Sequence, residues 1–336
     1  MKTAQIVLLG FILLLAGVAW SMGLPLEGLI SDLMVRVPMN GVLVLSMLPI
    51  YNAGMGINFG LPVAVIAGLL GMCIAVNMRL SGLPGLGAAI AFGLPWAIGL
   101  GFIYARLLRR VQGREEIAAT FIGFSFVSLM NLFWLLAPFT NPAMLWPIGG
   151  QGLRPTIGLV PYFAKYLNRL WSIKIGGTTI PIGMLAAFAL ICLGLHLFFR
   201  TRSGLAMTST GENKAFARVS GVDVDRIRVW AVIISTCLGS MGIVFYAQSY
   251  GFLELYDAPL MMGFPAASAV LIGSLGRPGI SVIQAVLGTV LFQGMLVFSA
   301  PIANAALVPE AAEIVRMLLT NGIILFALLA RIRIRS

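Results

Sequence analysis

The sequence predicts an all-α, polytopic membrane protein with one transmembrane domain over residues 1–336. Of the 336 residues, 60% are hydrophobic and only 10% are charged, and the mean hydropathy is +1.00. A soluble globular domain carries about 25% charged residues, so this composition excludes that class. In addition, apolar runs long enough to cross a hydrocarbon core of about 30 Å, which takes about 20 helical residues, recur from end to end.

The apolar runs predict about ten membrane spans. The first follows Lys2 and lacks a clean cleavage pattern, so we interpret it as an uncleaved helix rather than a signal peptide. In chain order the predicted spans are 5–22, 39–57, 59–77, 86–107, 117–138, 179–199, 229–248, 262–275, 280–298 and 315–330.

The basic residues predict the orientation of these spans. With the N-terminus in the cytoplasm, 15 of the 22 Lys and Arg residues fall on the cytoplasmic side, as the positive-inside rule requires. Both termini and the loop 200–228 are then cytoplasmic, and the long loop 139–178 is external. In that loop, residues 161–172 place apolar and basic side chains on opposite faces, which predicts an interfacial helix. The net charge of +11 is thus explained by topology and does not indicate nucleic-acid binding.

The same topology allows an internal repeat. Spans 2–5 and 7–10 would have opposite orientations, as inverted repeats require. The sequence echo is short: Glu116–Ile117 opens one span, and Glu313–Ile314 opens its counterpart.

One polar segment, "TSTGENKAFARVSGVDVDRIR" at residues 208–228, interrupts the apolar chain. Ser209 and Glu212 form a capping-box pattern that predicts a helix start, and Gly221 suits a left-handed stop. Ala215, Phe216, Val219 and Val222 share one apolar face. A helix of about ten residues is marginal alone in water, so it must rest on lipid headgroups or dock to a soluble partner.

Residues Gly211–Asn213, Ala217, Arg218 and Gly221 resemble the cytoplasmic loop of permease subunits of bacterial ABC importers, of the branched-chain amino acid, ribose and nucleoside type. The run "LIGSLGRPGISVIQAVLGTVLFQG" (271–294) is similar to the second half of that family, and the likeness covers roughly residues 40–330. The run "GREEIAATFIGFSFVSLMN" (113–131) looks most like the nucleoside type. By contrast, "YNAGMGINFGLP" (51–62) lacks the aspartate that sugar permeases usually carry there.

The resemblance implies a coupling helix that docks to a separate ATPase subunit. Its residues would be Ser209, Gly211, Glu212, Asn213, Phe216, Ala217, Arg218 and Gly221. It further implies ATP-binding subunits, a second permease subunit (the same or homologous), an extracytoplasmic substrate-binding protein and the bacterial inner membrane. The expected solute is a nucleoside or simple sugar, with branched-chain amino acids as the alternative.

The residues themselves argue for transport without catalysis. No P-loop pattern is present in the sequence, so ATP must be handled by another chain. The single histidine, His196, has no acidic neighbour in sequence, and no His, Cys and Glu cluster predicts a metal. We therefore expect neither a cofactor nor a catalytic residue. The alternative is an ion-coupled secondary transporter or channel, but the acidic residues all map to loops or span ends, which argues against coupling to protons or sodium.

The solute path is predicted where polar residues interrupt the spans. Residues 39–77 leave no room for a loop between two spans, so their glycine-rich middle is expected at membrane depth, where broken helix is tolerated only inside protein or beside water. Amides and aromatic faces there could hold a neutral polar ring. The alternative for each is an interhelical hydrogen bond or simple packing. The candidate path residues are Asn52, Asn58, Phe59, Asn131, Trp134, Phe245 and Gln248.

Overall fold

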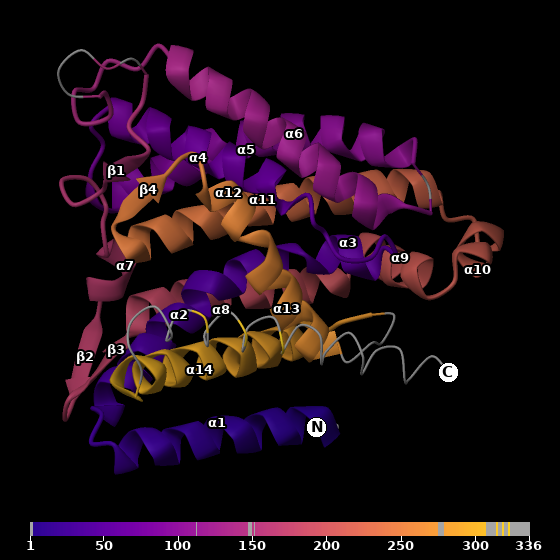
Figure 1. Cartoon of the computed structure of the whole chain (residues 1–336). Helices are drawn as coiled ribbons and strands as arrows, with labels where there is room; N and C mark the ends of the chain where they lie inside the picture. Colours follow the sequence, from indigo (N-terminus) through magenta and orange to yellow (C-terminus); the bar gives the residue numbers. More distant parts are fainter. Residues whose placement is uncertain are drawn as a thin grey trace.

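The computed structural model describes residues 3–111, 113–146, 150, 152–274 and 279–306, and the single residues 314, 318 and 322. Long helices run roughly side by side between two ends of the molecule (Figure 1). We call the end with helices α9 (Arg202–Glu212) and α10 (Lys214–Val219) the coupling end. The opposite end carries four short strands, and we call it the loop end.

Most elements follow one another along the chain with short connections, and the longest described gap lies between α6 and β1. Besides α9 and α10, they are α1 (Thr3–Ser21), α2 (Leu26–Ser46), α3 (Leu48–Asn52), α4 (Leu61–Asn77), α5 (Gly82–Arg109), α6 (Glu115–Leu136), β1 (Thr156–Gly158), α7 (Tyr166–Arg169), β2 (Ser172–Ile175), β3 (Thr178–Pro181), α8 (Ile182–Phe199), α11 (Val224–Tyr250), β4 (Phe252–Glu254), α12 (Ala258–Met261), α13 (Gly263–Ser274) and α14 (Val282–Ala306).

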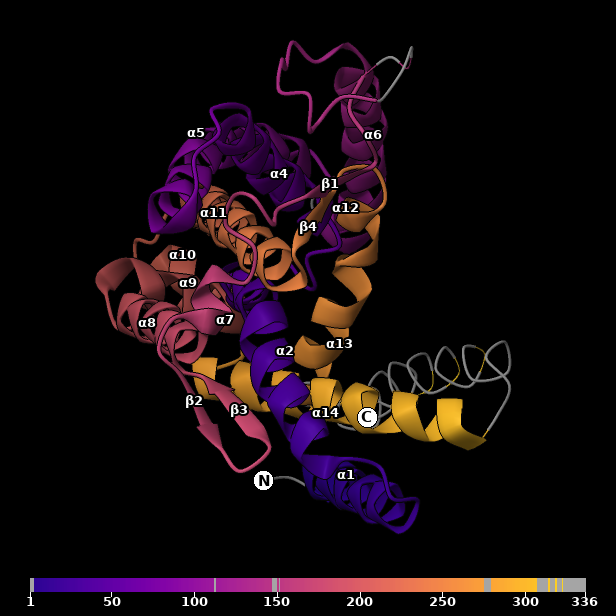
Figure 2. The same cartoon turned by 90° about the vertical axis from the view of Figure 1, so that its left-hand side faces the viewer.

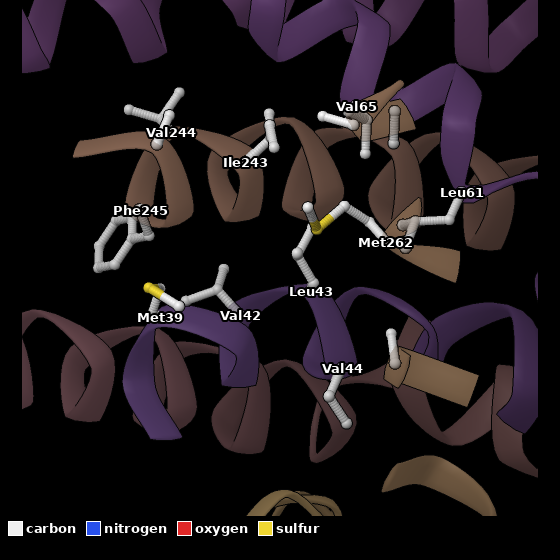
Figure 3. Packing of buried hydrophobic residues seen from close by; sticks show 14 of the residues in the cluster. Met39, Val42, Leu43, Val44, Leu61, Val65, Ile243, Val244, Phe245 and Met262 are labelled. Atoms are coloured by element: carbon white, nitrogen blue, oxygen red, sulfur yellow. The ribbon is translucent and has the colours of Figure 1, made fainter. Parts of the chain in front are cut away.

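Helix α2 lies at the centre of the bundle. On one side it packs against α11, which in turn packs against α4 and α5, and on the other side it packs against α14 (Figure 2). Helix α1 contacts mainly α14 and lies at the margin. The buried core between α2 and α11 brings Met39, Val42 and Leu43 against Ile243 and Phe245 (Figure 3). Burying such side chains stabilises a fold by about 1.5–3 kcal/mol each in water, and in lipid the same contacts act through close packing.

Glycines allow the closest helix contacts. A Cβ atom on Gly71 of α4 would overlap the Ala89 carbonyl of α5, and one on Gly68 would overlap the Ser240 carbonyl of α11. Small residues at such crossings let the backbones approach, which is the usual basis of helix association in membranes. The α4–α5–α11 group is therefore held by backbone proximity rather than by large side chains.

The predicted spans are confirmed in kind but not in number. Among the described residues, six helices are long and apolar enough to cross a membrane, and three shorter apolar helices cover Gln5–Ser21, Leu61–Asn77 and Ala258–Ser274. The predicted span 315–330 falls outside the described residues apart from positions 318 and 322, so the count of ten, the cytoplasmic termini and the inverted repeat stay predictions.

The second predicted span begins in the wrong place. The helix starts at Leu26, not at residue 39, and continues through α3 to Asn52. Because 13 residues are added at its beginning, residues 53–60 no longer fall in the middle of a crossing. They connect α3 to α4 next to Gly211, at the coupling end (Figure 1).

Residues 139–178, the loop predicted to be external, are not purely helical, so the all-α prediction needs a correction. Strand β1 pairs antiparallel with β4, and β2 with β3. The interfacial helix predicted over 161–172 is reduced to the single turn of α7, because Lys165 and Trp171 adopt left-handed conformations with φ of 54° and 52°. Left-handed residues cannot continue a right-handed helix.

Candidate coupling end and solute path

The polar segment folds as two capped helices. The Thr201 hydroxyl caps α9 by accepting from the Gly204 N–H at 3.3 Å, and the Asn213 side chain caps α10 by accepting from the Phe216 N–H at 3.0 Å. The predicted capping box is therefore wrong: Ser209 lies inside α9, where its hydroxyl donates to the Ala206 carbonyl. The first helix starts eight residues earlier than expected, and Asn213 recaps the chain where it turns.

Helix α10 ends as the sequence predicts. Gly221 has φ of +81°, the Val222 N–H donates to the Ala217 carbonyl, and the Gly221 N–H donates to the Arg218 carbonyl. This is the Schellman pattern, which satisfies the last carbonyls of a helix. The chain is thus fixed at both ends of a helix of only six residues.

The apolar face of α10 is split between the protein and solvent. Ala217 is fully buried, whereas Phe216 is 64% exposed and Val219 is 89% exposed. Glu212 and Arg218 are exposed beside them. A rigid, capped turn that presents two large apolar side chains among charges has the composition of a protein-docking surface.

Gly211 joins α9 to the membrane helices. A Cβ atom on Gly211 would overlap the Asn52 carbonyl, and a Cβ atom on Gly54 would come within 2.9 Å of the Gly211 Cα atom. Asn52 in turn donates from Nδ2 to the Ile280 carbonyl at 3.0 Å and accepts from the Ile280 N–H at 2.8 Å. Movement of α9 would thus be passed directly to α3 and to the start of α14.

A buried ion pair lies at the same end. Arg228 Nη1 lies 3.0 Å from Glu115 Oε1, and both side chains are about 10% exposed. Arg228 Nη2 donates to the Gly54 carbonyl at 3.0 Å, and Glu116 accepts from the Ile57 N–H at 3.0 Å. The starts of α6 and α11 are thereby tied to the 53–60 connection.

Sequence reasoning did not single out Arg228, Glu115 or Glu116 as functional candidates. The available signal was a cation at the start of one apolar run (Arg228) and two acids at the start of another (Glu115 and Glu116). The charges of this cluster also act on Lys214 in α10. Partial desolvation and then the charge of Arg228 lower the pKa of Lys214 from its usual value, while Glu115 opposes that change.

Asn58 and Phe59 lie in the connection between α3 and α4 and pack against other helices, Asn58 on α5 and α11 and Phe59 on α13. Asn58 Oδ1 accepts from the Tyr104 hydroxyl at 2.7 Å and from the Gly60 N–H at 3.1 Å, and its Nδ2 donates to Ser235 at 3.2 Å. The Phe59 ring packs against Phe264 with centroids 5.8 Å apart. The Asn58 network has the form of the interhelical hydrogen bonding that was the alternative to a path residue.

Replacing Tyr104 with phenylalanine tests that network. Loss of the hydroxyl leaves Asn58 Oδ1 with the Gly60 N–H alone, and we expect the free energy of unfolding to fall by about 0.5–1.5 kcal/mol. Thermal unfolding of the purified protein in detergent measures this. The matched control is Tyr256→Phe, whose hydroxyl makes a long 3.4 Å bond to the Leu153 carbonyl; equal effects of the two changes would contradict the network.

Phe245 and Gln248 lie further along α11, toward the loop end. Phe245 is buried against α2 (Figure 3). Gln248 is fully buried; its Nε2 donates to Asn168 Oδ1 at 3.1 Å, and its Oε1 accepts from the Leu167 N–H at 3.3 Å. Gln248 therefore fastens α7 to α11.

Asn131 and Trp134 lie one turn apart on α6. Trp134 is fully buried, and within the described part of the chain neither its Nε1 nor Asn131 Oδ1 has a hydrogen-bond partner. The seven predicted path residues thus do not meet in one place. Asn52, Asn58 and Phe59 lie toward the coupling end. Asn131 and Trp134 lie on α6, and Phe245 and Gln248 lie on the half of α11 nearer the loop end.

The fold defines a multi-pass membrane protein. At the coupling end, its long helices contact the surface helix α9 through Gly211. Residues 29–328 match the family model described as the branched-chain amino acid transport system / permease component, and the chain belongs to that family of ABC transporter permeases.

Two curated relatives are similar over part of their length. The nucleoside ABC transporter permease protein NupC of Lactococcus lactis is 29% identical over 134 residues, which cover 40% of this chain and 41% of NupC. The autoinducer 2 import system permease protein LsrC of Yersinia enterocolitica is 25% identical over 224 residues, which cover 64% of this chain and 58% of LsrC. The matched regions span less than two thirds of either relative.

The fold is also similar to that of a solved structure, an inward-facing conformation of a metal-chelate type ABC transporter. The TM-score is 0.50 at 14% identity, with 97% of both chains covered. At this identity the likeness concerns the fold alone.

Proposed function

We propose that the chain is the membrane subunit of an ATP-driven importer, that it carries a small polar solute, and that it couples to a separate ATPase subunit through α9 and α10. One observation carries the coupling role. The exposed turn at Phe216 and Val219 is capped at both ends and rests on the membrane helices through Gly211. A rigid element of this kind can pass a nucleotide-driven movement into the bundle.

The coupling end would face the cytoplasm. Arg106 and Arg109 lie in the last turn of α5 there, Arg200 follows α8, and Arg202 begins α9. Such an excess of cations is typical of the cytoplasmic side. The loop end, with its strands, would then meet an extracytoplasmic substrate-binding protein, and a second permease subunit would complete the path. The family supports these partners in general, and the two relatives favour a nucleoside or a sugar-like solute over a branched-chain amino acid.

The test is co-purification of an ATPase. From mild detergent, the tagged protein is expected to bring down an ATP-hydrolysing subunit. The Glu212→Ala/Arg218→Ala variant should retain roughly a tenth of that subunit or less, because each lost docking contact is worth about 1 kcal/mol or more.

The matched control removes one acid and one base at the loop end, Asp257→Ala/Lys174→Ala, and should retain the partner fully. Co-purification at the wild-type level by the Glu212/Arg218 variant would contradict the docking role. A wild-type protein that purifies alone, without nucleotide dependence, would instead favour the gradient-driven transporter or channel.

A further inference from the structure

A cavity of about 200 Å³ opens between α4, α11 and β4 on the outer half of the molecule. Its lining residues are Leu69, Ile243, Tyr246, Ala247, Tyr250, Phe252, Glu254 and Ala258. One water occupies about 30 Å³ in the liquid, so the cavity holds several waters or one small ring. None of these lining residues was a predicted path residue, although two predicted path residues, Phe245 and Gln248, are their neighbours on α11.

The cavity has an aromatic wall. The Tyr246 and Tyr250 rings stack with centroids 5.3 Å apart and planes at 11°, and Phe252 meets Tyr250 edge-on at 5.0 Å. Stacked and crossed rings of this kind form a rigid, flat surface. The two phenol hydroxyls and the Glu254 carboxylate add polar groups to an otherwise apolar lining, which is the usual composition of a small-molecule site.

A charged stripe on α2 faces the same region. Asp32 and Arg36 form an i,i+4 ion pair at 2.7 Å, and Asn40 follows one turn later and donates to the Arg36 carbonyl. Met39 of α2 lies against Phe245 of α11 (Figure 3). Arg36 is about one turn from Met39 and Tyr246 follows Phe245, so the stripe runs along the part of α2 that packs beside the cavity. Helices α2 and α11 pack together, and β4 lies next to α11 (Figure 2).

The stripe lies inside the membrane helix. Arg36 is ten residues from the start of α2, or about 15 Å along the axis, and the crossing itself takes about 30 Å. Asp32 lies six residues from the start of α2, about 9 Å along the axis, which is close to the span end where acidic residues were expected. Arg36 and Asp32 remain 40% and 45% exposed. Ionised side chains within a span almost always pair with one another or line a watery cavity, and the partly exposed Asp32–Arg36 pair fits a position beside such a path.

We infer that this cavity, together with the Asp32–Arg36 stripe, is a solute-binding subsite for a hydroxylated sugar ring, either free or as the ribose of a nucleoside. The inference rests on the proposed function and names its solute class. Asp32 already pairs with Arg36. Among the described residues, the charged group that lines the cavity without an ion-pair partner is the Glu254 carboxylate, an acceptor that suits ring hydroxyls. The aromatic wall suits the apolar face of such a ring, whereas a free amino acid would need an unpaired cation for its carboxylate.

Equilibrium dialysis of the permease in nanodiscs, without ATP or partners, tests the subsite with labelled uridine, ribose and leucine as probes. The wild type is expected to bind uridine, ribose or both. Glu254→Gln and Tyr246→Phe should raise the Kd at least about tenfold, since each removes a hydrogen bond to the ring. Asp257→Asn, an exposed carboxylate three residues from Glu254, is the matched control and should not change the Kd.

The probes separate the two sources of the ring. Binding of both uridine and ribose assigns the site to the sugar alone, and binding of uridine alone assigns it to the nucleoside. Preference for leucine, absence of binding by the wild type, or an unchanged Kd in Glu254→Gln and Tyr246→Phe would overturn the inference. Because removing Arg36 alone leaves Asp32 unpaired, Asp32→Asn/Arg36→Gln serves as a further variant: it should elute as wild type in size-exclusion chromatography and still bind more weakly.

ATP-dependent uptake into proteoliposomes separates this inference from the proposed function. A wild-type permease that binds the probe but shows no ATP-dependent uptake, with ATPase subunit and binding protein present, would contradict the importer and leave the subsite standing. Uptake of uridine or ribose with an unchanged apparent KM in Glu254→Gln would overturn the subsite and leave the importer standing.

Discussion

Replacement of Arg228 by methionine is expected to lower the free energy of unfolding by about 3–5 kcal/mol. The change leaves Glu115 buried without its cation, and breaking one partner of a buried ion pair has a cost of this size. The Gly54 carbonyl loses a donor as well. Thermal unfolding in detergent measures the loss, and Arg226→Met, an exposed cation two residues away, should stay within about 0.5 kcal/mol of wild type.

The double variant Arg228→Met/Glu115→Gln separates charge from packing. With both charges gone, no ion is left buried alone, so much of the lost stability should return, as it does when buried pairs are replaced together. Losses that simply add in the double variant would contradict a coupled pair. The double variant is still expected to transport poorly, because it lacks the hydrogen bond from Arg228 that joins the start of α11 to the Gly54 carbonyl.

Composition and hydropathy predict the class of this protein because every membrane span needs an apolar helix of sufficient length. They do not predict the boundaries of a span that contains charged residues. Residues 26–38 include Glu27, Asp32 and Arg36, so they read as a loop, yet they form the first half of α2. The packing of α2 against α11 and α14 shows that these residues belong to a helix of the bundle, although Glu27 is exposed and Asp32 and Arg36 are half-buried.

The coupling segment shows a second limit. Thr201, Ser209 and Asn213 can all cap a helix, and local propensity does not rank them. The choice depends on where α9 must end for Gly211 to meet Asn52, a contact between residues 159 positions apart. The Arg228–Glu115 pair likewise joins residues 113 apart. Asn58 and Gln248 were predicted as path residues because they are single polar positions in apolar runs. The structure shows both as buried amides, and their hydrogen-bond partners could not be predicted from the sequence.

Replacement of Gly211 by valine is expected to uncouple ATP hydrolysis from transport. The new side chain would overlap the Asn52 carbonyl, a backbone atom that cannot turn aside, so α9 must move away from α3. Such overpacking typically costs about 1–3 kcal/mol, which leaves a folded protein. Because α10 and its docking face remain intact, the ATPase subunit should still co-purify and hydrolyse ATP, while solute uptake per ATP falls roughly tenfold or more.

The comparison variant is Gly194→Val on α8, where nothing lies within 4 Å of the new Cβ atom. It introduces the same side chain into a helix without a clash, so uptake per ATP should match wild type. Uptake and hydrolysis both at wild-type levels in Gly211→Val would contradict a coupling role for the α9–α3 contact. Loss of ATPase binding would instead mean that Gly211 shapes the docking surface itself. Retained hydrolysis without uptake is the result that only a mechanical link between α9 and α3 predicts.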